Sequence, residues 1–586
     1  MKPGPASAEE GLGRARSRTL LTVAALAVML AAADTYVVVL ALPDMMAGAG
    51  LGIESLQRGT PIISGFLLGY IAVLPLIGRL ADLVPRQRIL IACLLVFVLG
   101  SAITAVAVEL PVMVAGRFLQ GLGGGGLVPA TLALVADLWP PGRRGLPLGV
   151  VGGVQEFGAV LGPLLGAAVL LVSDWRGIFW LNVALGLLFC AGVAMAGARL
   201  RTAAPRERST QRADRRARPR PLTVAVGLLA VVVASLSMLT LAPPDALTTS
   251  VAYGGPFVPL ADDSTSRVLT PIGLATLGVA LLLAVLVGVR ALPVLLQADL
   301  LGATLVAVAL GSVVLTFSTA DPEVQVLGPW GLWLLPVGAA AFVGFVLRQR
   351  TATNPLIGRG VVRARVWPAL GVSVFVGAAI VAIVVDIPLL ARLDGQASQT
   401  QAALVLLRFL VAVPVGALVG GAVLRWLPPG LVAAPGLPLT AVALAVMATW
   451  TVGSLAEGAT TAVTLAAAGL GVGMALAPVN DAALADAPAS AHGTVSSLVV
   501  VARMVGMVVG LALLTAVGLR RFYDAVAQLP QPVEAQALLD TGVVQVQTVF
   551  AGASLAAAAA AVLALGLGVR RTVQDERTGH KDRTVA

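Results

Sequence analysis

Segments of about 20 predominantly apolar residues, the length that a helix needs to cross the hydrocarbon core of a bilayer, recur along almost the whole chain. We count about sixteen of them in the 586 residues. Charged residues make up only 12% of the chain, whereas soluble globular proteins contain about a quarter. The sequence therefore predicts an all-α polytopic membrane protein and excludes a soluble globular one.

The basic residues indicate how the chain crosses the membrane. They gather in alternate loops, for example at Arg86 and Arg88 and at Arg143 and Arg144, and positive residues prefer the cytoplasmic side. This distribution predicts an even number of spans with both termini in the cytoplasm. Because these loops account for the net charge of +10, we expect contacts with membrane lipids and no nucleic-acid binding.

Two basic stretches divide the spans into groups of six, four and six. The expected domains are a cytoplasmic N-terminal segment (1–18), an N-terminal six-helix bundle (19–198), an Arg-rich cytoplasmic linker (199–221), four inserted or linker transmembrane helices (222–347) with an outer loop (243–270), a basic cytoplasmic loop (348–365), a C-terminal six-helix bundle (366–569) and a cytoplasmic tail (570–586).

The two groups of six resemble repeats of one another. A shift of 348 residues superposes three pairs of glycines: Gly145 with Gly493, Gly158 with Gly506, and Gly162 with Gly510. The same shift brings Glu156 to the position after Arg503, so each half carries one ionisable residue at a similar depth, of opposite sign. Repeated bundles with a site near the membrane midplane are typical of transporters.

Six ionisable residues lie within the apolar spans or at their edges: Asp34, Glu156, Asp386, Arg117, Arg408 and Arg503. Such residues are costly in a membrane and therefore mark functional sites. By depth, we expect Glu156 and Arg503 to form a central ion lock. We expect Asp386 and Arg408 to form a charge pair in the outer half.

Asp34 then stays without a partner and is the candidate proton carrier, because an acid paired with arginine remains ionised. The alternative is that all three acids are held in ion pairs that only set the register of the helices.

Three motifs resemble those of the major facilitator superfamily. The loop after the second span contains Gly78, Asp82, Arg86 and Arg88 and resembles the pattern G-x-x-x-D-x-x-G-R-[KR]. It departs from that pattern at two positions, Pro85 and Gln87. We expect Asp82 to pair with Arg86 and to accept hydrogen bonds from a helix N-terminus, so that this loop acts as a cytoplasmic gate.

The other two motifs lie in the fourth and fifth spans. Arg117 begins an R-x-x-x-G motif, and this resemblance implies that Arg117 takes part in proton coupling with Asp34. Alternatively, Arg117 is a structural partner of an acid or of backbone carbonyls. The fifth span resembles the antiporter motif, with Gly158, Gly162, Pro163 and Gly166. Its glycines recur on one helix face, and the resemblance implies a hinge between the bundles in alternating access.

Within this superfamily the chain is most similar to the drug:proton antiporter branch with fourteen spans, and there to its lipid-exporting members. The second resemblance rests on Asp34-Thr35-Tyr36, Gln155-Glu156 and His492-Gly493. It implies two six-helix bundles in a bacterial inner membrane, export of triacylglycerol and a periplasmic lipoprotein as partner. The chain departs from fourteen spans because 222–289 adds a pair of helices.

These observations favour a proton-coupled secondary active exporter of a hydrophobic or amphipathic substrate, either a triacylglycerol-like lipid or a drug, that works by alternating access. The sequence shows no nucleophile constellation, metal cluster or phosphate-binding loop. We therefore expect no enzyme activity and no cofactor, with a proton gradient as the energy source, and we expect a monomer. The alternatives are a proton-coupled importer of a small polar solute and a non-transporting membrane sensor.

Overall fold

The computed structural model describes residues 5–50, 56–202, 221–260, 266–318, 330–393, 399–456, 458–530 and 535–569. Within these ranges every regular element is a helix. Most of the expected Arg-rich linker and the expected C-terminal tail lie outside the described residues.

The helices follow the expected order of six, four and six long elements. The first six are α1 (Pro5–Gly48), α2 (Leu56–Leu83), α3 (Arg86–Val106), α4 (Leu110–Leu138), α5 (Gly145–Leu170) and α6 (Trp175–Thr202). The middle of the chain forms α7 (Pro221–Leu241), the short α8 (Asp245–Thr248), α9 (Pro271–Gln297), α10 (Leu300–Ser318) and α11 (Gly331–Thr351). The last six are α12 (Val366–Leu393), α13 (Gln399–Val423), α14 (Pro429–Met447), α15 (Gly458–Asp486), α16 (His492–Val526) and α17 (Ala535–Ala564).

Among the described residues, fourteen helices are long and apolar enough to cross a membrane. Two shorter apolar helices, Ala225–Leu241 and Leu300–Thr316, belong to α7 and α10. The prediction of an all-α polytopic membrane protein is confirmed, and the expected number of about sixteen spans is approximate.

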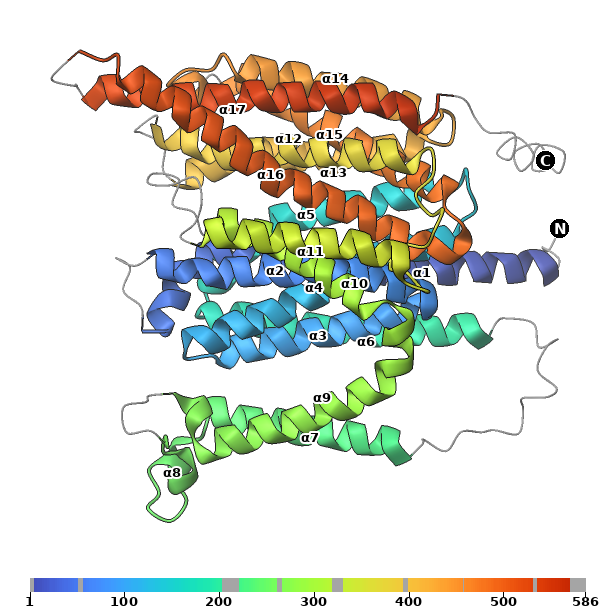
Figure 1. The fold of residues 1–586 in the computed structure, drawn as a ribbon, viewed down its shortest axis with the longest axis vertical. Coiled ribbons are helices and arrows are strands. Elements are labelled where there is room, and N and C mark those ends of the chain that lie inside the picture. Colours follow the sequence, from blue (N-terminus) through green and yellow to red (C-terminus); the bar gives the residue numbers. More distant parts are fainter. Residues whose placement is uncertain are drawn as a thin grey trace.

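Two helical bundles form the body of the molecule. In Figure 1 the blue and cyan helices α1–α6 lie beside the yellow to red helices α12–α17. Each bundle has its own buried apolar core, with Phe66 and Phe97 in the first and Phe409 and Phe550 in the second. The bundles meet where α2 packs on α16 and where α5 packs on α13.

Glycine contacts show the same repeat that the sequence shift indicates. Gly158 of α5 lies against α1, and Gly506 of α16 lies against α12, so each of these helices packs on the first helix of its own half. Gly145 and Gly493, at the starts of the same two helices, lie against α13 and α2 of the opposite half. The fifth helix of each half, α5 or α16, therefore packs on the first helix of its own bundle and on the second helix of the other bundle.

The four helices between the bundles form two pairs. α7 and α9 pack on each other and lie at the lower edge of the view in Figure 1. Their apolar side chains are widely exposed, as expected for a surface that faces lipid, with Leu281 66% exposed. α10 packs on α11 and also on α2 of the first bundle.

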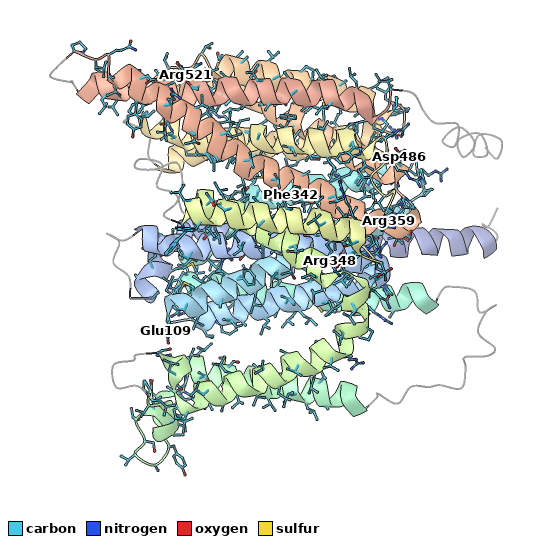
Figure 2. All side chains as sticks on the ribbon, viewed as in Figure 1. Glu109, Phe342, Arg348, Arg359, Asp486 and Arg521 are labelled. Atoms are coloured by element: carbon cyan, nitrogen blue, oxygen red, sulfur yellow. The ribbon has the colours of Figure 1, made fainter. Side chains whose placement is uncertain are left out.

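The two ends of the bundles are distinguished by their charged side chains. Figure 2 shows Arg348, Arg359 and Asp486 at one end, which we call the basic face, and Glu109 and Arg521 at the other end, which we call the opposite face. α1 begins and α17 ends on the side of the basic face in Figure 1.

Candidate functional site

Asp34 is the acidic centre of a buried polar network in the first bundle. Its Oδ2 accepts a hydrogen bond from Arg117 Nη1 (2.5 Å), and its Oδ1 accepts from Gln120 Nε2 (2.8 Å) and Asn182 Nδ2 (2.5 Å). Gln120 Nε2 also donates to Ser101 Oγ (2.9 Å). Asp34 and Arg117 are each only 1% exposed. A buried ion pair needs such additional hydrogen bonds, because both charges have lost their water.

Arg117 makes further contacts that connect several helices. Its Nη1 also donates to Gln120 Oε1 (2.6 Å), and its Nε donates to the carbonyl oxygen of Ile62 (3.4 Å). Its Cζ lies 4.4 Å from the ring centroid of Phe66 and 5.8 Å from that of Phe179. Cation–π contacts of this kind are strongest where water is excluded. Arg117 of α4 therefore joins α1, α2 and α6 at one point.

Glycines on α4 explain why these side chains meet. A Cβ atom on Gly121 would lie 2.0 Å from the carbonyl oxygen of Phe66, and one on Gly125 would lie 2.3 Å from that of Tyr70. Only glycine allows the backbones of α2 and α4 to approach so closely. The close approach brings Arg117 into the centre of the bundle, where it reaches Asp34.

Glu156 and Arg503 form an ion pair between the two bundles. Arg503 Nη1 lies 3.3 Å from Glu156 Oε1, and the two side chains are 11% and 15% exposed. They come from α5 and α16, the helices that the 348-residue shift relates. The structure thus brings together the two residues of the expected ion lock.

Two small chambers meet at this ion pair. The first, which we call the central chamber, contains about 640 Å³ of empty space, part of it open to the outside. Its walls are mostly apolar or aromatic: Ala32, Thr35, Tyr36, Phe66, Leu67, Tyr70, Gln155, Glu156, Ala159, Ile380, Arg503, Met504 and Met507. The second contains about 490 Å³ and shares Gln155 and Arg503 with the first. Apolar walls with a few polar groups are typical of sites for small apolar ligands.

Asp82 connects the two bundles at the basic face. Its carboxylate accepts hydrogen bonds from the backbone N–H groups of Gly493 (2.7 Å) and Thr494 (2.9 Å) and from Thr494 Oγ1 (2.6 Å). These groups lie at the N-terminus of α16, where free N–H groups and the helix dipole favour a carboxylate. Gly78 allows the approach, since a Cβ atom there would lie 2.1 Å from Ser497 Oγ.

Arg86 lies beside this contact. Its Nη2 is 3.4 Å from Asp82 Oδ1, and its Nε is 3.2 Å from Asp137 Oδ2. Asp137 Oδ1 in turn lies 3.8 Å from Nδ1 of His492, the first residue of α16. Arg88, the remaining residue of the expected gate, is exposed.

A second ionic contact joins the bundles at the basic face. Arg144 Nε donates to Asp481 Oδ1 (2.7 Å), and its Nη2 donates to the carbonyl oxygen of Asp481 (3.3 Å). The sequence indicates Arg144 only as a topology signal and does not indicate Asp481. The two residues are 337 positions apart, so no local pattern relates them.

The antiporter-motif glycines lie inside the first bundle, against α1, and the expected hinge role stays a prediction. Cβ atoms on Gly158 and Gly162 would lie 2.5 Å and 2.4 Å from carbonyl oxygens of α1. α5 continues as a helix through Pro163 to its end at Leu170, and Gly166 is buried. The sequence periodicity identifies the glycine face correctly but does not say which helix covers it.

A different row of glycines on α5 faces the second bundle. Gly145, Gly149 and Gly153 lie against α13, and a Cβ atom on Gly149 would lie 2.5 Å from the carbonyl oxygen of Ala417. This row has the same spacing of four residues as the antiporter motif. The spacing alone could have identified it as a second packing face.

The expected charge pair between Asp386 and Arg408 is wrong. Arg408 Nη1 instead donates to the carbonyl oxygen of Gly458 (3.3 Å). Asp386 is 2% exposed, and its Oδ2 has no hydrogen-bond partner in the part of the chain that the structure describes. Asp34, which was expected to lack a partner, is bound to Arg117. Position along a span does not fix the direction in which each side chain points.

Gln120 and Asn182 complete the network around Asp34 and are not among the expected site residues. Both are uncharged polar residues in apolar spans, and both are buried. Such residues often form hydrogen bonds between membrane helices, so their presence in the fourth and sixth spans is the signal that could have identified them.

Comparison with known proteins agrees with this fold. The model of the Major Facilitator Superfamily matches residues 24–349. A triacylglyceride transporter of Mycobacteroides abscessus is 34% identical over 529 residues, covering 88% of this chain and 86% of the relative. A triacylglyceride transporter of Mycolicibacterium hassiacum is 35% identical over 513 residues, covering 86% of this chain and 79% of the relative.

Among solved structures, the human organic anion transporter TETRAN matches 94% of this chain and 99% of its own chain, with a TM-score of 0.52 and 15% identity. This last likeness concerns the fold alone. The relatives with higher identity are named transporters, which agrees with the prediction that the chain is not an enzyme. The chain belongs to the Major Facilitator Superfamily.

Proposed function

We propose that this membrane transporter exports a triacylglycerol-like lipid, or another hydrophobic or amphipathic molecule such as a drug, in exchange for protons. The observation that carries the proposal is the central chamber, whose apolar walls contain one ion pair and border a buried acid network. Relatives named triacylglyceride transporters, which match most of the chain, support a lipid as the first candidate.

The contacts of Arg117 suggest how protons and substrate affect each other. Phe66, which lies under the guanidinium of Arg117, is part of the wall of the central chamber, and so are Thr35 and Tyr36, which follow Asp34 in α1. The pairing with Arg117 keeps Asp34 ionised in the present conformation, so we propose that Asp34 takes up a proton only when Arg117 moves away. The proton then removes the negative charge that holds Arg117. Arg117 then relies on its remaining partners, and the position of Phe66 in the chamber wall changes with it. Binding at either site is thereby coupled to the other.

Alternating access requires that the contacts at the basic face separate. In the present conformation Asp82 holds the start of α16, and Arg144 holds Asp481. We propose that both contacts break when the chamber opens to the basic face, and that the Glu156–Arg503 lock opens with them. The rows of small residues between α5 and α13 let these helices slide with little steric resistance.

The distribution of basic residues supports an orientation of the chain in the membrane, from which a direction of transport follows. The positive-inside rule supports a cytoplasmic basic face, and with it two cytoplasmic termini. We propose a bacterial inner membrane as the location, since the relatives are bacterial transporters. A substrate released at the opposite face would enter the periplasm, where a lipoprotein could receive it. Both bundles and the chamber between them belong to one chain, so we propose that the monomer is the transporting unit.

The test is a flux assay with the purified chain in lipid vesicles. Labelled triacylglycerol and a cationic dye are offered separately, with and without an imposed pH gradient. Movement of triacylglycerol that increases with the gradient supports the first candidate, and movement of the dye alone supports drug export. Binding without movement would favour a sensor, uptake of a small polar solute would favour an importer, and either result would contradict the proposal.

A further inference from the structure

A narrow crevice in the first bundle reaches Asp34 from the side of α5 and α6. Its walls include Asp34 and Val37 of α1, Gly162 and Leu165 of α5, and Asn182 of α6. The other residues that line it are apolar. The crevice contains about 310 Å³ of empty space, part of it open to the outside, which leaves room for a water molecule beside Asp34. Asp34 and Asn182, which are hydrogen-bonded to each other, can also form hydrogen bonds with a water molecule in the crevice.

The crevice extends toward the opposite face of the molecule. Its walls also include Val169, next to the last residue of α5, and Ile178, in the first turn of α6. Asn182 lies seven residues after Trp175, the first residue of α6. At 1.5 Å per residue this corresponds to about 10 Å along the helix axis. The carboxylate of Asp34 is therefore only about two helical turns from the start of α6, which lies toward the opposite face.

The crevice and the central chamber lie on different sides of α1. Ala32, Thr35 and Tyr36 line the chamber, whereas Asp34 and Val37 line the crevice. A proton that arrives through the crevice would not have to pass a bound substrate.

We propose that this crevice is the route by which water brings protons to Asp34 from the opposite face. Asn182 is the positioning residue at its inner end, because its amide donates to Asp34 Oδ1 and also borders the crevice. The inference rests on the proposed proton coupling through Asp34 and adds the path that serves it.

Adjacent leucines on α5 allow a matched test of water access. Leu165 lines the crevice and is 38% exposed, whereas its neighbour Leu164 is 54% exposed at nearly the same depth. Cys93 and Cys190, the two natural cysteines, are first replaced by alanine. Leu165→Cys and Leu164→Cys are then treated, in vesicles that expose the opposite face, with a charged thiol reagent that cannot cross the membrane.

We expect Leu165→Cys to react at least tenfold faster than Leu164→Cys. The thiolate is the reactive form, and it forms only where water is present. A second pair, Leu165→Phe and Leu164→Phe, tests the consequence for transport. Filling the crevice with Leu165→Phe should slow flux driven by a pH gradient at least threefold without changing substrate binding, and Leu164→Phe should leave both unchanged.

The outcomes distinguish the route from the function on which it rests. If Asp34→Asn loses its response to a pH gradient but the two cysteines react at equal rates, the route is wrong and the coupling residue stands. If Asp34→Asn keeps its response to the gradient, proton coupling at Asp34 fails, and the proposed route fails with it whatever the labelling rates.

Discussion

Arg503 Nη1 and Glu156 Oε1 lie 3.3 Å apart, although 347 residues separate them in the chain. The pair, which is the ion lock, joins equivalent helices of the two halves and forms part of the wall of the central chamber. Each side chain has lost most of its contact with solvent, so neither charge is stable there without the other.

Replacement of one partner should therefore destabilise the protein. Glu156→Gln leaves Arg503 charged and without its acid, and we expect the free energy of unfolding to fall by about 3 kcal/mol. The double variant Glu156→Gln/Arg503→Gln should recover part of this loss. Unfolding in detergent, followed for both single variants and the double variant, measures the coupling, which we expect to be about 1–3 kcal/mol. Losses that simply add would show that the two side chains do not interact.

Asp34 and Asp386 offer a matched comparison, since each is a buried aspartate in the first helix of its bundle. Asp34→Asn removes the charge that binds Arg117, so we expect pH-driven flux per folded molecule to fall at least tenfold. Asp386→Asn removes a group that lines neither chamber and holds no arginine among the described residues, so we expect flux within twofold of the parent. Loss of pH-driven flux in Asp386→Asn alone would show that the coupling acid lies in the second bundle.

Much of the fold could be predicted, because apolar segments and clusters of basic residues can be recognised directly in the sequence. The first indicate the membrane-spanning helices, and the second indicate the loops between groups of helices. The long apolar segments are helices, although α6 and α11 extend a few residues into the expected basic stretches, to Thr202 and Thr351. The Glu156–Arg503 contact also follows from the sequence, because the repeat relates α5 to α16. Asp82 meets a helix N-terminus as its motif implies.

The direction of each buried side chain could not be predicted in the same way. Sequence specifies how deep a residue lies in a span, but the neighbour that it faces depends on how the helices rotate and approach. Gly121, for example, lets α4 approach the backbone of Phe66, and this approach places Arg117 against Asp34. The contact of Arg144 with Asp481 likewise depends on the closure of the two bundles.

Gly78 offers a test of the contact at the basic face. Gly78→Val should prevent α2 and α16 from closing, since its first side-chain carbon would lie 2.1 Å from Ser497 Oγ and 2.9 Å from the carbonyl oxygen of Gly493. We expect flux to fall at least tenfold and a cysteine introduced at Ser497 to become accessible from the basic face. Gly227→Val is the matched control, because a Cβ atom there meets nothing within 4 Å. Normal flux in Gly78→Val would show that this contact does not limit transport.

Substitutions of Asp299, which lies between α9 and α10, test how much this turn contributes to the free energy of unfolding. Its φ angle of 51° lies in the left-handed region, which aspartate and asparagine tolerate better than alanine. Its carboxylate accepts hydrogen bonds from Arg348 Nε (2.7 Å) and from the backbone N–H groups of Gly302 (3.2 Å) and Leu356 (3.2 Å). Asp299→Ala loses all three bonds and keeps an unfavourable backbone conformation, so we expect a loss of about 2–4 kcal/mol in the free energy of unfolding.

The backbone and side-chain contributions of Asp299 can be separated with two further variants. Asp299→Gly loses the same hydrogen bonds but tolerates the positive φ, so it should be about 1 kcal/mol more stable than Asp299→Ala. Asp299→Asn keeps the backbone preference and one acceptor oxygen, and it should be the most stable of the three. Thermal unfolding of the three proteins in one detergent gives the order. An Asp299→Gly protein no more stable than Asp299→Ala would assign the whole effect to the lost hydrogen bonds, and flux should be unchanged in all three because Asp299 lies outside the walls of the central chamber.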